Sequence, residues 1–177
     1  MEQNILVELK NVEKKVGALS SAQKILLTAD GSVTSILDVL RGHVGITTLV
    51  QEFVPADEAM AASLNVDVGD TINYRVVIIG GEEPLIYAVS LVPVDRLTSG
   101  CREDLIGADI PIGRILKEHN IESRREIKSI YVEDADKELR EIFKTDSLFL
   151  CRTYHIINRG KILMCIKEMF PYNIFKE

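Results

Sequence analysis

The final alternating stretch of the chain, residues 161–170, predicts a strand with one charged residue on its apolar face. Successive side chains of a strand point to opposite faces, so Glu168 shares a face with Ile162, Met164 and Ile166. An ionised carboxylate in such surroundings is costly unless a cation or a hydrogen-bond donor meets it. We therefore expect Glu168 to face a polar site within an otherwise apolar core.

A second strand, residues 71–79, shows the complementary exception. Its alternation puts Arg75 on one face with Asn73 and the aliphatic Val77. An arginine and a glutamate on aliphatic strand faces, far apart in the sequence, indicate one polar site in a sheet-based pocket. The alternative for Arg75 and Glu168 is a structural ion pair buried in the core, because ion-pair networks also bury charge.

In the rest of the chain, segments with helical spacing of apolar residues alternate with segments that show the period of a strand. Apolar residues at helical spacing in residues 1–28, interrupted at Gly17 or at Ser20–Ser21, predict two helices ahead of the sheet. A short helix capped by Ser32 or Thr34 is expected to run through residue 40. The expected strands are 44–54, 71–79, 85–92, 125–133, 148–157 and 161–170, and the further helices are 57–64, 114–119 and 134–144, the last capped by Asp134.

This order of elements predicts an α+β fold. Most strands are joined as hairpins, which favours a single, mainly antiparallel sheet of about six strands. Helices precede the sheet and occupy the two longer connections, while the part of residues 100–120 ahead of the expected helix carries loop signals. One face of such a sheet is buried under helices, and Arg75 and Glu168 lie beneath this cover if their faces coincide.

Length and composition restrict the classes of function. The 177 residues are most simply one domain, residues 1–177, with 46% hydrophobic and 27% charged residues as in ordinary soluble proteins. The net charge of −6 argues against nucleic acid as the main partner. Neither a membrane-spanning apolar run nor a signal pattern is present, so we expect a cytoplasmic protein without a membrane partner. Cys101, Cys151 and Cys165 lack zinc-binding spacing and are expected to be reduced thiols.

Four stretches, met in order along residues 26–171, carry a resemblance to a known family. They are LLTADGSVT at 26–34, YRVV at 74–77 with EPL at 83–85 and VP at 92–93, LIG at 105–107 with IPIG at 110–113, and CRTY at 151–154 with GK at 160–161 and EMFP at 168–171. Each stretch is weak by itself. The ordered set resembles the chorismate–pyruvate lyase family, including its archaeal and actinobacterial relatives.

The resemblance implies an enzyme that splits chorismate into 4-hydroxybenzoate and pyruvate without a metal or an organic cofactor. It implies that Arg75 holds the ring carboxylate and that Glu168 meets the ring hydroxyl. Main-chain groups at Ile112 and Gly113 line the implied site, and Val33 packs on the ring from a helical flap. The family fold, an antiparallel sheet covered by helices that enclose a ligand cavity, agrees with the pattern described above.

Two positions depart from the family pattern. Cys151 stands where bacterial members have an aromatic residue, and Val33 stands where methionine is common. These departures concern substrate affinity and flap packing more than the reaction.

Two interpretations of Arg152 stay open, since it either holds the second substrate carboxylate or pairs with an acidic surface residue. We interpret the pair Arg124–Arg125 as solvated charge.

The sequence is also compatible with a second class of function, a protein that binds a small molecule without catalysis. The fold also resembles the effector-binding domain of GntR-type transcription regulators, which binds small acids or sugars without turning them over. Those regulators carry a basic helix-turn-helix region ahead of that domain, and here about 25 residues precede the first matched stretch. The sequence therefore favours a lyase acting on a small aromatic acid, with a stand-alone small-acid-binding module as the alternative.

Overall fold

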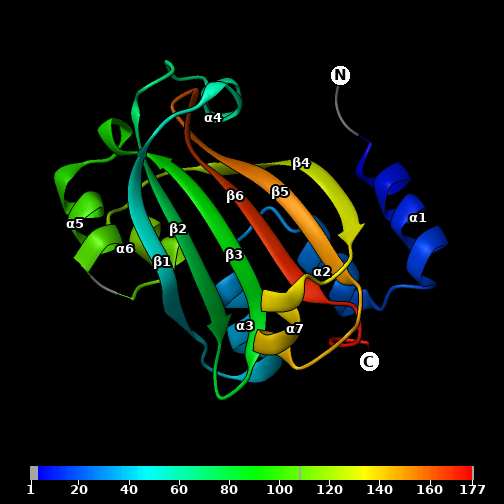
Figure 1. Ribbon diagram of the computed structural model, residues 1–177. Coiled ribbons are helices and arrows are strands. Elements are labelled where there is room, and N and C mark those ends of the chain that lie inside the picture. The colour runs from blue at the N-terminus through cyan, green and yellow to red at the C-terminus, as the bar shows by residue number, and fades with distance from the viewer. Residues whose placement is uncertain (1–3, 108, 177) are drawn as a thin grey trace.

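A six-stranded antiparallel sheet forms the body of the protein. The computed structural model describes residues 4–107 and 109–176. The strands follow the spatial order β1 (Gly45–Pro55), β2 (Thr71–Gly80), β3 (Pro84–Pro93), β6 (Lys161–Pro171), β5 (Phe149–Asn158) and β4 (Arg124–Glu133), as Figure 1 shows. The predicted α+β class, the six strands and the antiparallel pairing are thereby confirmed.

Seven α-helices occur in the described part of the chain. The two helices predicted ahead of the sheet are present, and the Ser20 side chain caps the second one together with Gln23. The Asp57 side chain caps the helix that follows β1. The helices are α1 (Ile5–Val16), α2 (Ser21–Thr28), α3 (Val33–Arg41), α4 (Glu58–Leu64), α5 (Ser99–Gly107), α6 (Ile112–Glu118) and α7 (Lys137–Phe143), with a 3-10 turn at Val94–Arg96.

Two helix predictions need correction. The segment that forms α5 was interpreted as a loop, because its run of small and charged residues shows no clear apolar stripe. Its buried residues are Cys101 and Leu105, which pack in one apolar cluster with residues of α6 and of the sheet. These contacts join segments that are distant in the sequence, so they leave no local pattern. Helix α7 is capped by Asp136 and not by Asp134, since the Asp136 carboxylate accepts a hydrogen bond from the Leu139 amide at 2.8 Å.

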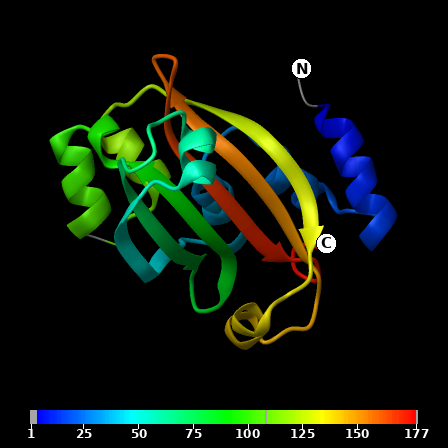
Figure 2. The same ribbon diagram turned by 45° about the horizontal axis from the view of Figure 1, so that its top comes forward.

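Helices lie on both faces of the sheet, although the larger group covers one face. Apolar residues of α1, α2 and α3 pack on one end of the covered face, and residues of α5 and α6 pack on its other end. The short helices α4 and α7 pack on the opposite face, against separate apolar clusters that include Ile72 and Phe149 respectively. Figures 1 and 2 show α1 beside β4 and the α5–α6 pair at the far end of the molecule.

A β-bulge in the last hairpin changes the face of one residue. The pairing of β5 with β6 shifts between Ile156 and Ile157, and their partners are Met164 and Ile162. Ile162 therefore packs with the α4 cluster on the opposite face, and not on the face of Glu168 as simple alternation predicts. Beyond the bulge the alternation holds, so Ile166 and Glu168 keep the predicted face.

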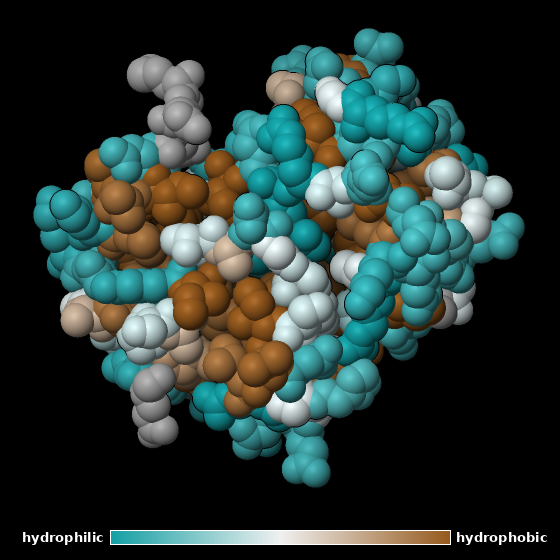
Figure 3. Space-filling model, turned by 180° about the vertical axis from the view of Figure 1, so that it is seen from behind, coloured by the Kyte–Doolittle hydropathy of each residue, from teal (hydrophilic) through white to brown (hydrophobic). Residues whose placement is uncertain are grey.

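The exposed side of the first three helices is partly apolar. Figure 3 views the molecule from behind and shows brown apolar groups gathered over these helices. None of the helices in residues 4–107 and 109–176 has the length and apolar character needed to cross a membrane. The large exposed apolar side chains of α1 to α3 are Leu6, Val7, Ile25, Val39 and Leu40.

The buried Gln23 ties α2 to the C-terminal segment. Its side-chain amide donates to the carbonyl oxygens of Tyr172 at 2.7 Å and Ile174 at 3.0 Å. We expect Gln23→Ala to lower the free energy of unfolding by about 2–4 kcal/mol, because it leaves these acceptors unsatisfied. Urea unfolding measures this. The neighbouring Lys24→Ala, which removes a surface ion pair to Glu13, is the matched control and should cost under about 1 kcal/mol.

Candidate functional site

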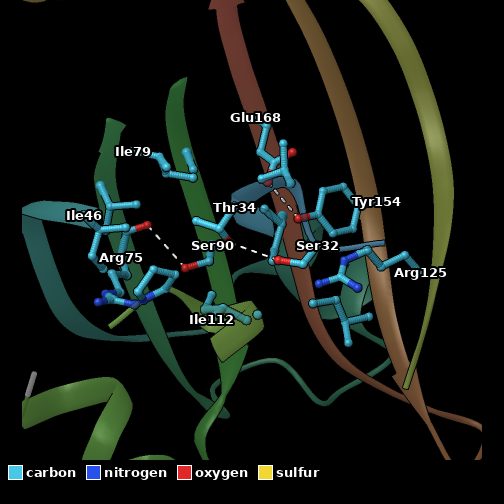
Figure 4. Close-up of a pocket in the computed structure, with 17 residues that line it drawn as sticks. Ser32, Thr34, Ile46, Arg75, Ile79, Ser90, Ile112, Arg125, Tyr154 and Glu168 are labelled. Atoms are coloured by element: carbon cyan, nitrogen blue, oxygen red, sulfur yellow. Dashed lines mark hydrogen bonds between the residues drawn. The ribbon is translucent and has the colours of Figure 1, made fainter. Parts of the chain in front are cut away.

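A cavity lies between the covered face of the sheet and the starts of α3 and α6. It contains about 480 Å³ of space free of protein atoms, counting the part that opens to solvent. Figure 4 shows the labelled side chains pointing into this space. The sheet contributes Ile46, Arg75, Val77, Ile79, Ala88, Ser90, Arg125, Tyr154, Ile156, Ile166 and Glu168, and the cover contributes Ser32, Val33, Thr34, Pro111, Ile112 and Gly113.

One side of the cavity holds Arg75 of β2. Its side chain is 1% exposed, and both terminal nitrogens donate long hydrogen bonds, at 3.4 and 3.5 Å, to the Ile110 carbonyl. Ser90 stands opposite Arg75 on β3 and also lines the cavity. The loop above is held by Thr48, whose hydroxyl donates to the Asp109 carboxylate at 2.6 Å. A buried guanidinium beside open space is suited to binding a carboxylate.

The other side holds Glu168 of β6, which is 3% exposed. Its carboxylate accepts a hydrogen bond from Nε of Arg152 at 2.7 Å and another from the Tyr154 hydroxyl at 2.9 Å. The cation that the sequence analysis required for Glu168 is therefore Arg152. A buried ion pair forms between Glu168 and Arg152, while Arg75 and Glu168 line different sides of the cavity.

Arg152 lies behind Glu168 and is not among the side chains that line the cavity. Besides Glu168, it donates from Nη1 to the Ala29 carbonyl at 2.8 Å, in the loop ahead of α3. Its partner is thus a buried acid, and the interpretation that it pairs with an acidic surface residue is wrong. The register explains the contact, because Arg152 and Glu168 are direct neighbours on β5 and β6.

The starts of α3 and α6 meet closely above the cavity, and this contact depends on Gly113. A β-carbon at Gly113 would lie 2.5 Å from Oγ of Ser32 and 3.2 Å from its Cβ. Ser32 also hydrogen-bonds to Thr34 at 2.9 Å, between their hydroxyl oxygens. Val33 and Ile112 line the cavity from the same two helix starts, so three of the residues expected at the site, Val33, Ile112 and Gly113, face the cavity from the cover, and Arg75 faces it from the sheet.

Tyr154 and Arg125 are among the cavity residues that sequence reasoning missed. Arg124 is solvated as expected and pairs with Glu126 at 2.7 Å, but Arg125 faces the cavity, so the prediction of solvated charge is wrong for Arg125. A signal for it was available, because Arg125 alternates with the apolar Ile127 in the predicted strand.

Burial changes the ionisation of the polar groups in and behind the cavity. Desolvation lowers the pKa of Arg75, against the attraction of the Asp109 carboxylate. Burial and the adjacent Glu168 charge raise the pKa of Tyr154, so its phenol remains a hydrogen-bond donor at neutral pH. Desolvation opposes the charge of Arg152, but the Glu168 carboxylate beside it raises its pKa overall. Glu168 is therefore held by two groups that keep their protons.

Comparison with known proteins identifies the family. The family model described as "Chorismate pyruvate-lyase Rv2949c-like" matches residues 27–176. The chain belongs to this family. The resemblance inferred from the four ordered stretches is thereby confirmed, and the match spans the cavity residues from Ser32 to Glu168.

The relatives of this chain differ in their sequence identity to it. A provisionally named lyase of Methanocaldococcus jannaschii, MJ0807, is 40% identical over 164 residues, which is 88% of this chain and 81% of the relative. A chorismate pyruvate-lyase of Mycobacterium tuberculosis is 22% identical over 173 residues, covering 93% and 87% of the two chains.

Solved structures share the fold at low identity. The effector domain of PhnF from Mycobacterium smegmatis matches with a TM-score of 0.65 and 15% identity, covering 80% of this chain and 88% of that chain. A GntR-family transcriptional regulator from Bacillus cereus matches with a TM-score of 0.57 and 14% identity, covering 76% and 95%. These matches bear out the predicted fold relationship to GntR effector domains.

The contact between the two helix starts is testable through Gly113. We expect Gly113→Ala to lower the free energy of unfolding by about 1–3 kcal/mol, because the new methyl group overpacks against Ser32. Urea unfolding measures the loss. Gly107→Ala is the control, since a β-carbon there meets nothing within 4 Å. Adding Ser32→Ala should recover part of the loss, and equal stability of the Gly113→Ala and Gly107→Ala variants would contradict the contact.

Proposed function

We propose that this protein converts chorismate to 4-hydroxybenzoate and pyruvate. The observation that carries the proposal is one cavity lined by both Arg75 and Glu168, in a member of the chorismate pyruvate-lyase family. In this proposal Arg75 binds the ring carboxylate of the substrate, and Glu168 engages the ring hydroxyl and assists proton transfer. Val33, Ile112 and Gly113 enclose the ring from the two helix starts.

The bond changes place modest demands on the protein. The C–H bond at the ring carbon that bears the hydroxyl breaks, and its electron pair forms the third double bond of the ring. The C–O bond to the enolpyruvyl group breaks with its electron pair, and protonation of the released enol at its methylene carbon gives pyruvate. Because the ring becomes aromatic, the reaction is downhill, and orientation of the substrate is the main requirement.

Arg75 suits the orienting role. A guanidinium binds a carboxylate through two parallel hydrogen bonds, and this geometry fixes the plane of the bound group. The side chain is 1% exposed, so the attraction acts with little screening by water. The long bonds from Arg75 to the Ile110 carbonyl are weak enough for a substrate carboxylate to take their place.

The carboxylate of Glu168 is held in a position that suits proton transfer. One carboxylate oxygen accepts from Arg152 and the other from Tyr154, so the group is fixed in orientation at the cavity wall. Each carboxylate oxygen has a second acceptor site, which leaves capacity for the ring hydroxyl or a ring proton. A positioned carboxylate of this kind contributes roughly 10²- to 10⁴-fold to a proton-transfer step.

The direct test mixes the purified protein with chorismate. We expect pyruvate and 4-hydroxybenzoate to appear in equal amounts, followed by coupled pyruvate oxidation and by the absorbance of the aromatic product. Chorismate that binds without release of either product would favour the small-acid-binding module. Absence of both binding and turnover would overturn the proposed function.

Substitution of Glu168 tests its role. We expect Glu168→Gln to lower kcat for chorismate by about 100-fold or more, because the side chain can no longer accept a proton. Glu168→Asp keeps a charge beside Arg152 and should also lose activity, with less loss of stability. Glu133→Gln removes a carboxylate paired with Lys167 outside the cavity and is the matched control. If Glu168→Gln released pyruvate at the wild-type rate, the proton-transfer role would be excluded.

A further inference from the structure

Arg125 of β4 is a charged cavity residue that the proposed function leaves without a role. It lines the cavity beside Tyr154, with its guanidinium carbon 6.0 Å from the centre of that ring. Figure 4 shows its guanidinium directed inward, on the opposite side of the cavity from Arg75. It donates a long hydrogen bond, 3.5 Å, to the Asp30 carbonyl, and its Nε is buried without a hydrogen-bond partner among the described residues.

The neighbouring arginines differ from Arg125 in their partners. Arg124 pairs with Glu126 and Arg152 pairs with Glu168. Within residues 4–107 and 109–176, Arg125 forms no ion pair, although it lies in a cavity wall near the buried Glu168. A cation so placed has donors available for an anion that enters the cavity.

We propose that Arg125 binds the second carboxylate of a dicarboxylic substrate and thereby distinguishes the substrate from its monocarboxylic aromatic product. This inference rests on the proposed function, in which Arg75 binds the ring carboxylate. The ligand class is a cyclic acid whose second carboxylate is carried on an ether side chain, as the enolpyruvyl group carries it in chorismate.

The charges of the cavity match such a ligand. The lining side chains include two arginines, Arg75 and Arg125, and the carboxylate of Glu168. Because Arg152 already balances Glu168 at 2.7 Å, the positive charge of Arg125 faces the cavity without a paired carboxylate among the described residues. A dicarboxylate supplies two negative charges, whereas the aromatic product supplies one. Electrostatic complementarity of this kind selects among ligands.

The two arginines lie on widely separated strands, which favours a ligand with one anionic group for each. Arg75 is on β2 and Arg125 is on β4, which lie four strand intervals apart in the sheet. Strand intervals are roughly 4.8 Å, so the two backbones are about 19 Å apart along a flat sheet. A ligand that meets both guanidinium groups is therefore best served by two anionic groups, one directed toward each strand.

The arrangement also has a consequence for turnover. The contact with Arg125 belongs to the enolpyruvyl part of the substrate, which departs as pyruvate. Cleavage of the C–O bond therefore removes this contact from the aromatic product, while the contact with Arg75 remains. Arg125 thus contributes to substrate affinity and does not hold the aromatic product in the cavity.

Paired substitutions on one strand test the proposal. We expect Arg125→Gln to raise KM for chorismate roughly 10- to 100-fold, the effect of losing a charge-assisted contact. The affinity for 4-hydroxybenzoate, measured by calorimetry, should change less than about twofold, because this product lacks the carboxylate that Arg125 binds. Arg124→Gln removes an exposed arginine from the same strand and should change neither quantity. Arg125→Lys keeps the charge without the planar donor pair and should fall between Arg125→Gln and the wild type.

The outcomes separate this proposal from the proposed function. Equal chorismate KM values for Arg125→Gln and Arg124→Gln would overturn the Arg125 assignment while the lyase activity stands. An equal loss of affinity for chorismate and 4-hydroxybenzoate would also overturn it, because a general structural role affects both ligands. Retained binding of 4-hydroxybenzoate by Arg125→Gln shows that the variant is folded. Wild-type protein that neither binds nor cleaves chorismate would overturn the proposed function itself.

Discussion

The burial of the Glu168 carboxylate is the constraint on which the rest of the site depends. Its removal from water is costly, and the cost is offset by Arg152 at 2.7 Å and the Tyr154 hydroxyl at 2.9 Å. Arg152 also donates to the Ala29 carbonyl, ahead of α3. A single polar network therefore fixes the carboxylate, the Tyr154 side chain and the loop that leads into the cover of the cavity. Buried ion pairs are weak evidence for stability, so positioning is the effect that this network explains.

The cavity exists because bulky side chains are absent where the cover meets the sheet. Gly113 lets the starts of α3 and α6 approach each other through Ser32. On the sheet, Ala88 and Ser90 provide small side chains beside Arg75 and Glu168, which leaves room above β3. Apolar clusters close both ends of the covered face, so the open space is confined to the region between the two groups of helices.

The fold by itself does not decide between catalysis and binding. The effector domain of PhnF shares the fold at 15% identity, and such a likeness concerns the path of the backbone alone. Membership in the lyase family comes from the match over residues 27–176. The proposed function rests on side chains that line the cavity of this scaffold, which include a buried carboxylate and an arginine on either side of it.

Much of this structure follows from local sequence patterns. Period-two alternation is a property of neighbouring residues, and it identified the six strands and the faces of Arg75 and Glu168 before any coordinates were considered. It failed where the pattern was interrupted. The bulge at Leu163 moved Ile162 to the other face, and the weakly patterned α5 was interpreted as a loop.

The sequence by itself determined the fold class, the family resemblance and the two unusual charges of the cavity. Only the tertiary structure decided that Arg152 is the partner of Glu168 and that Arg125 faces the cavity. Both facts depend on the placement of β6 between β3 and β5, with β4 at the edge. The physical reason is that strand register chooses the partner of a buried charge. Without the bulge, the β5–β6 hairpin would pair Arg152 with Lys167, and simple alternation along the chain does not reveal a bulge.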